Sequence, residues 1–138
     1  MRKIYPPLFV TIFLSLVIII VSWLVPEYEH TFLLSEDGRY TVTRVNYDGQ
    51  TYFTYGKHES NSIPRNYVRP QISGVTDGFE VILYFEQDTA VFYAHYGQFE
   101  KVGNNKKLKV KVYEGYGNDP LYYQMKYDDT GKYKVLHD

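Results

Sequence analysis

The hydrophobic pattern divides the chain into two parts. Leu8–Val25 is an apolar run of 18 residues that is interrupted only by Thr11, Ser15 and Ser22. From residue 30 onward, apolar and polar residues alternate with a period of two, which is typical of strands that bury one face. No stretch of this second part has the apolar spacing of a helix longer than two turns. The pattern therefore predicts one apolar helix followed by an all-β domain.

Turn signals divide the alternating part into strands. Asp48-Gly49 lies between two alternating segments and predicts a two-residue type I′ turn, which pairs Val45 with Tyr52. A second turn, around Gln87-Asp88, pairs Leu83 with Phe92. Strands are predicted near residues 31–34, 39–47, 50–56, 79–86, 89–97, 106–114, 121–127 and 132–136.

The second hairpin has one fully apolar face, which we expect to lie in the core. This face carries Phe79, Val81, Leu83, Phe85, Ala90, Phe92, Ala94 and Tyr96. The register also sets Glu80 opposite His95 on the other face. Such a cross-strand pair is either a pH-sensitive contact or an ordinary solvated ion pair.

Lys106–Glu114 alternates so that Leu108, Val110 and Val112 face one way and three lysines face the other. Outward lysines keep the edge of a sheet from pairing with other chains, or else they contact an anionic surface such as lipid headgroups. Together the strands predict a small antiparallel barrel or sandwich of about seven or eight strands, preceded by one transmembrane helix.

The apolar run has the length of a membrane-spanning helix. At 1.5 Å per residue it extends roughly 27 Å, close to the thickness of the hydrocarbon core. Its exit, Ser22-Trp23-Leu24-Val25-Pro26, lacks the small residues of a signal-peptide cleavage site. We therefore expect a retained signal anchor; the alternative is an unusually long signal peptide that is cleaved. The residues expected to form the anchor are Leu8, Phe9, Ile12, Phe13, Leu16, Ile19, Ile20 and Trp23.

The charges around the run orient it. Arg2 and Lys3 precede it and every acidic residue follows it, so the positive-inside rule keeps the N-terminus in the cytoplasm. The predicted organisation is a cytoplasmic N-terminus over residues 1–7, an anchor over 8–25, a short tether over 26–30 and a β domain over 31–138. The β domain is expected outside the cytoplasm, in the periplasm or the extracellular space.

Composition narrows the possible functions. The formal net charge is −1, and the part after Pro26 carries 13 basic against 16 acidic residues, which argues against nucleic-acid binding. The chain has no cysteine, so disulfides, thiol catalysis and cysteine-ligated zinc are excluded. Sixteen tyrosines and eight phenylalanines agree with a strand-rich domain.

The segment Lys57–Asp77 is a candidate partner-binding loop. Its 21 residues show no strand pattern, and loops of this length inside a compact domain are usually functional or disordered. It contains Arg65, Tyr67 and Arg69, which alternate along an extended chain and belong to the residue types that most often anchor interfaces. The alternative is a surface crossover whose arginines pair with nearby acids.

A second candidate site is a group of tyrosines around the loop of residues 115–120. Aromatic faces stack on sugars, and each hydroxyl can form hydrogen bonds, so this group could bind a glycan or another small ligand. Tyrosine is also an ordinary strand residue in a small β domain. The candidate ligand-binding residues are Tyr113, Tyr116, Tyr122 and Tyr123.

Recognisable catalytic and metal-binding motifs are absent from the sequence. There is no Gly-x-Ser-x-Gly motif and no glycine-rich phosphate loop, and His58-Glu59 lacks the second histidine of HExxH. We expect no enzymatic activity, no cofactor and no metal. The favoured hypothesis is a non-catalytic interaction module, an accessory subunit of a cell-envelope membrane complex, with the lipid bilayer and a protein as partners. The alternatives are a module that binds glycans or other small ligands, and an anchored inhibitor or immunity protein.

Overall fold

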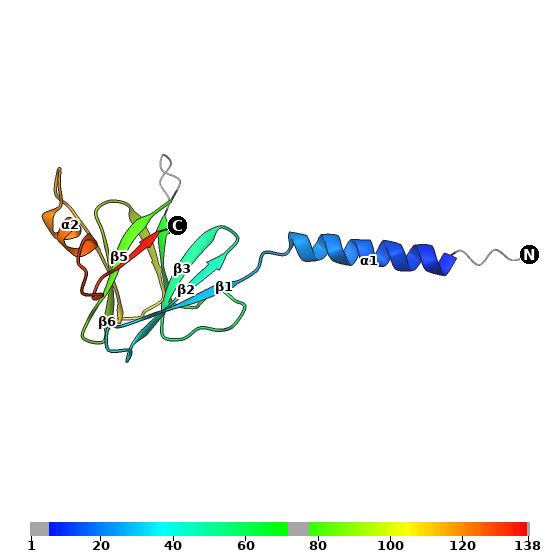
Figure 1. The fold of residues 1–138 in the computed structure, drawn as a ribbon, viewed down its shortest axis with the longest axis horizontal. Coiled ribbons are helices and arrows are strands. Elements are labelled where there is room, and N and C mark those ends of the chain that lie inside the picture. The colour runs from blue at the N-terminus through cyan, green and yellow to red at the C-terminus, as the bar shows by residue number, and fades with distance from the viewer. Residues whose placement is uncertain (1–5, 72–77, 138) are drawn as a thin grey trace, which may run out of the picture.

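The structure, a computed structural model, describes residues 6–71 and 78–137, with side chains in the N-terminal helix described from Val10 on. Figure 1 shows the N-terminal helix α1 (Pro6–Leu24) extending away from a β domain. A second, short helix, α2 (Pro120–Lys126), lies on the far side of that domain.

The described residues form nine strands in two sheets. The first sheet has the order β1-β2-β3-β4-β7, with β1 (Glu29–Leu34), β2 (Thr41–Tyr47), β3 (Gln50–Tyr55), β4 (Tyr67–Gln71) and β7 (Gln98–Val102). The second sheet has the order β8-β6-β5-β9, with β8 (Leu108–Val112), β6 (Thr89–Ala94), β5 (Glu80–Glu86) and β9 (Lys134–His137).

The core lies between the two sheets. Phe53 of the first sheet packs against Phe92 of the second, with ring centroids 5.0 Å apart. The predicted core face of the second hairpin is confirmed over Val81–Ala94, but Tyr96 is exposed because β6 ends at Ala94. The all-β prediction is therefore confirmed, as a sandwich. The buried core residues are Val42, Phe53, Val68, Val81, Leu83, Ala90, Phe92, Ala94, Leu108 and Leu136.

Both predicted hairpin registers are confirmed. Val45 pairs with Tyr52, and Leu83 pairs with Phe92. Asp48 and Gly49 have φ values of 50° and 67°, as a type I′ turn requires.

The prediction of a purely antiparallel domain is wrong, because β8 pairs with β6 in parallel. Between β6 and β8 the chain crosses to the first sheet, where it forms β7. It then crosses back to the second sheet and runs parallel to β6 as β8. Parallel neighbours need such a crossover connection.

The strand predicted over residues 121–127 is also wrong, because this segment is helix α2. Asp119 caps the helix by accepting a hydrogen bond from the Tyr122 amide, and Pro120 occupies its first turn. Tyr122 and Met125 face the outer side of the second sheet and pack against Ile82 and Tyr93.

Two strands were missing from the prediction. β4 lies inside the predicted loop of residues 57–77, of which residues 72–77 fall outside the described part. β7 follows Gly97, whose φ of 117° turns the chain out of the second sheet.

Within the part of the chain that the structure describes, no helix combines the length and apolarity that a bilayer crossing requires. The signal anchor over residues 8–25 remains a prediction, and the side chains of Leu8 and Phe9 lie outside the described residues.

Candidate functional site

The structure brings together two of the three candidate partner-binding residues. β4 places Tyr67 and Arg69 on the outer face of the first sheet, whereas Arg65 precedes the strand and is exposed. Arg69 Nη2 lies 2.7 Å from Glu100 Oε2, and its guanidinium lies 5.7 Å from the centre of the Tyr52 ring. This arginine is therefore held by an acid and a ring of its own sheet.

The first half of the predicted loop packs on the same outer face. The amide of His58 donates to Thr43 Oγ1, and that hydroxyl donates to the carbonyl of Gly56. The His58 ring lies 2.8 Å from the Ser62 carbonyl oxygen. Among residues 6–71 and 78–137, no group of three or more acidic or histidine side chains is arranged to hold a metal ion.

Three of the four candidate tyrosines gather around His95, a residue that the sequence did not single out as a ligand site. The His95 ring stacks on Tyr113 at a centroid distance of 5.5 Å and lies 5.7 Å from Tyr122 and 6.5 Å from Tyr123. We call His95, Tyr113, Tyr122 and Tyr123 the tyrosine cluster. Tyr116 makes no ring contact within the described chain and is fully exposed.

A buried carboxylate lies under this cluster. Asp119 is only 1% exposed, and its Oδ2 accepts a hydrogen bond of 2.7 Å from the Tyr93 hydroxyl. His95 Nδ1 lies 3.8 Å from the same oxygen and has no hydrogen-bond partner in the described residues. Burial and the carboxylate raise the pKa of Tyr93 to about 12, so this hydroxyl remains a donor at neutral pH.

Glu80 is held by a second network beside the cluster. Lys126 Nζ donates to both carboxylate oxygens at 2.7 and 2.9 Å, and the Tyr122 hydroxyl also donates to Glu80. Burial opposes ionisation of Glu80, but these donors outweigh it and lower the pKa of its carboxyl. Burial and the Glu80 carboxylate raise the pKa of Tyr122.

The predicted pair of Glu80 with His95 is therefore wrong. β5 carries Glu80 opposite His137 of β9, and α2 supplies Lys126 and Tyr122 to its carboxylate. His95 lies beyond the end of β6 and faces Asp119 instead.

The outward lysines lie on a sheet edge, as the sequence predicts. β8 is the edge strand of the second sheet, with Leu108 buried and Lys109 exposed. Between β8 and β7, the edge strand of the first sheet, lies an open cavity of about 500 Å³. Its lining residues are Phe99, Lys101, Lys109, Val110, Lys111 and Val112.

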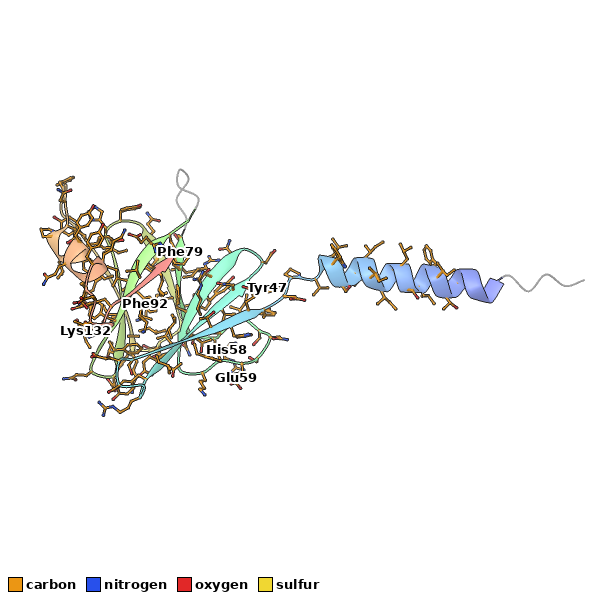
Figure 2. All side chains as sticks on the ribbon, in the orientation of Figure 1. Tyr47, His58, Glu59, Phe79, Phe92 and Lys132 are labelled. Carbon is orange, nitrogen blue, oxygen red and sulfur yellow. The ribbon has the colours of Figure 1, made fainter. Side chains whose placement is uncertain are left out.

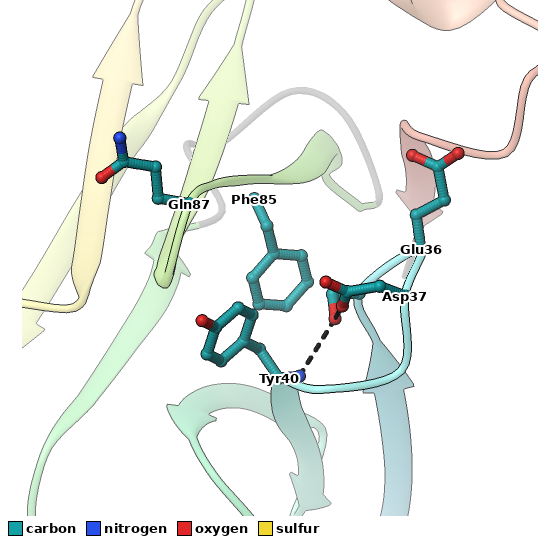
Figure 3. Close-up of a pocket in the computed structure, with 6 residues that line it drawn as sticks. Glu36, Asp37, Tyr40, Phe85 and Gln87 are labelled. Atoms are coloured by element: carbon teal, nitrogen blue, oxygen red, sulfur yellow. Dashed lines mark hydrogen bonds between the residues drawn. The ribbon is translucent and has the colours of Figure 1, made fainter.

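A further depression of about 400 Å³ lies where the β1–β2 turn meets β5. Figure 3 shows its lining, in which the Tyr40 amide donates to Ser35 Oγ at 3.0 Å. Ser35 Oγ donates in turn to Asp37, and hydrogen bonds from Ser35 and Arg39 lower the pKa of Asp37 to about 2. These groups satisfy one another, so they stabilise the turn and leave little for a ligand.

Comparison with known family models, with curated proteins and with solved structures gives no match to this chain.

Proposed function

We propose that this chain is a single-pass membrane protein whose β domain works outside the cytoplasm as a non-catalytic interaction module. In this proposal it is an accessory subunit of a cell-envelope membrane complex. α1 is the anchor, and the β domain contacts a protein partner close to the membrane surface.

The observation that carries the proposal is the exposure of α1. Every apolar side chain between Val10 and Val25 is at least 38% exposed, and Figure 2 shows side chains standing out above and below the helix. A helix that is apolar all round needs an apolar surrounding, because so much exposed apolar surface is unfavourable in water. A lipid bilayer supplies that surrounding on every side of the helix.

The junction between α1 and the β domain supports the same proposal. β1 begins at Glu29, so the sheet starts within roughly 18 Å of the helix end even if the connection is fully extended. Tyr28 stacks on Tyr47 at a centroid distance of 4.0 Å, and Trp23 near the helix end is 86% exposed. Tryptophan and tyrosine are enriched at the membrane–water interface.

Alkaline extraction of membranes from cells that express the full chain tests the anchor. We expect the protein to remain in the membrane pellet and its β domain to be digested by protease added outside. A double variant, Ile18→Arg with Ile19→Arg, should be released, because each charge at the helix centre costs about 2.5–3.5 kcal/mol of insertion. Extraction of the unmodified chain by alkaline buffer would contradict the anchor.

Crosslinking in intact membranes tests the accessory-subunit role. A photoreactive residue in place of exposed Arg65 should form a crosslink to a second protein. The same substitution at Lys132, on a turn between α2 and β9, serves as a surface control. If every position yields only crosslinks between copies of this chain, or none, the subunit role is wrong.

The tyrosine cluster favours a second candidate function, the binding of a glycan. Tyr122 is buried because α2 packs it against Ile82 and Tyr93, and its hydroxyl donates to Glu80. The exposed rings able to stack on a sugar are Tyr123 of the cluster, Tyr96 beside His95 and Tyr116 in the loop before α2. Tyr123→Ala combined with Tyr116→Ala should abolish retention on a cell-wall polysaccharide column, whereas Phe32→Ala on β1 should not. Absence of retention in the unmodified chain contradicts this function.

A further inference from the structure

The parallel pairing of β8 with β6 determines which backbone groups of β8 remain open. Lys107 O accepts from the Ala90 amide at 2.8 Å, and the Tyr113 amide donates to Ala94 O at 3.0 Å. In a parallel ladder the bonded residues alternate, so Lys109 and Lys111 also bond toward β6. Leu108, Val110 and Val112 therefore direct their N–H and C=O groups away from the sheet.

The outward backbone groups of Leu108 already have hydrogen-bond partners within the chain. The carbonyl of Leu108 accepts from Lys101 Nζ at 2.6 Å, and its amide donates to Asn105 O at 3.3 Å. Within the described chain, no strand or loop pairs with the outward groups of Val110 and Val112. The open edge of β8 is thus the stretch from Val110 to Val112.

The cavity between β7 and β8 lies directly beside this open edge. Phe99, Val110 and Val112 give it half-buried apolar walls, and its volume is about 500 Å³. A strand added to β8 would direct alternate side chains into this cavity and the others toward the outer face of the sheet.

The lysines on the outer face of the second sheet, along β8, determine which side chains an added strand should carry. Lys107 and Lys111 form ion pairs with Asp88 and Glu86, at 2.8 and 2.6 Å. Lys109, between them on β8, has no acidic group within ion-pair distance in residues 6–71 and 78–137. Two copies of β8 side by side would place lysines next to lysines, which disfavours self-pairing, whereas acidic side chains would be attracted.

We propose that the β8 edge binds, by strand addition, an extended segment of a partner protein in which acidic and apolar residues alternate. The acidic side chains lie beside Lys109 and Lys111, and the apolar side chains enter the cavity against Phe99, Val110 and Val112. This inference rests on the interaction role proposed above and specifies the chemistry of the partner.

A labelled peptide, Glu-Val-Glu-Val-Glu-Val, tests the proposal by fluorescence anisotropy with the full chain in detergent micelles. We expect saturable binding. A block peptide of the same composition, Glu-Glu-Glu-Val-Val-Val, should bind at least about tenfold more weakly, because it cannot separate acids and apolar groups onto two faces.

Two variants locate the binding at β8. Val110→Pro removes an amide that faces the open edge and makes no ladder bond to β6, so it should weaken binding at least about tenfold without breaking the sheet. Lys109→Glu should weaken binding of the acidic peptide and strengthen binding of Lys-Val-Lys-Val-Lys-Val. Lys132→Glu, on an exposed turn, makes the same charge change as a control and should alter neither affinity.

The outcomes separate this inference from the proposed function. Absence of saturable binding, equal binding of the block peptide, or unchanged affinity in Val110→Pro overturns the β8 proposal. If circular dichroism shows that Val110→Pro is unfolded, Lys109→Glu tests the β8 proposal in its place. A Lys109→Glu chain that still prefers the acidic peptide over the lysine peptide then overturns the proposal. A protein partner crosslinked in membranes while β8 binds no peptide would overturn this inference and leave the interaction role standing.

Discussion

At the scale of single residues, Asp119 joins two parts of the molecule that are distant in sequence. Its carboxylate caps α2 through the Tyr122 amide and accepts from the Tyr93 hydroxyl on β6. Because the residue is almost fully buried, both bonds form away from solvent. The position of α2 against the second sheet therefore depends on this carboxylate.

Replacing Asp119 should destabilise the domain through both bonds. Asp119→Ala removes a helix cap, which costs about 1 kcal/mol, and leaves the buried Tyr93 hydroxyl without its acceptor, which costs about 1–3 kcal/mol. Asp119→Asn keeps a capping side chain and should cost less. Urea unfolding of both variants measures the difference, and equal small losses would contradict this role of Asp119.

Glu80 should make stability depend on pH in the acid range. Its pKa is lowered in the folded state, so it adds stability above its ordinary value of 4.5 that is lost as the pH falls through the folded value. The groups facing it are Lys126, Tyr122 and His137. Glu80→Gln should cost about 1–2 kcal/mol at pH 7 and nothing well below pH 4.

Unfolding free energies of the parent and Glu80→Gln chains, compared from pH 7 to pH 3, check this prediction. A difference that stays constant across the range would show that the Glu80 charge does not contribute.

At the scale of elements, local signals in the sequence predicted some elements well and others not at all. The registers of both hairpins follow from turn chemistry and alternation, since one slipped residue would expose the core face. The sequence does not predict β4, because residues 57–77 lack a recognisable strand pattern, although Pro70 fits the strand as part of a short ladder. The parallel position of β8 depends on a crossover through the other sheet, which no local pattern reveals.

The composition of the candidate sites can also be read from the sequence, but their three-dimensional arrangement cannot. The tyrosines near residue 120 were singled out by composition, but His95 and Asp119 meet only because β6 and α2 pack together. The segment of residues 121–127 alternates like a strand, and its helix signal was the pair Asp119-Pro120 at the N-terminus.

Helix α2 makes a prediction that a strand would not. In the helix Met125 is buried with Tyr122, whereas Tyr127 is 75% exposed. Met125→Ala should therefore cost about 2–5 kcal/mol and Tyr127→Ala about 0.5 kcal/mol or less. In a strand these two side chains would share a face, so equal losses in thermal or urea unfolding would contradict the helix.

At the scale of the whole molecule, a small sandwich without cysteine follows an apolar helix that its own domain does not cover. The short connection and the Tyr28–Tyr47 stack hold the first sheet close to the end of that helix. In the proposed arrangement the bilayer covers α1, and the exposed surfaces of the sandwich face partners at the membrane surface.

The most direct test of this arrangement is the N-terminal sequence and intact mass of the mature protein extracted from membranes. Retention of the anchor predicts a mature chain that still contains residues 8–25. A mature N-terminus between residues 20 and 30 would contradict the anchor and remove the main support for the accessory-subunit role.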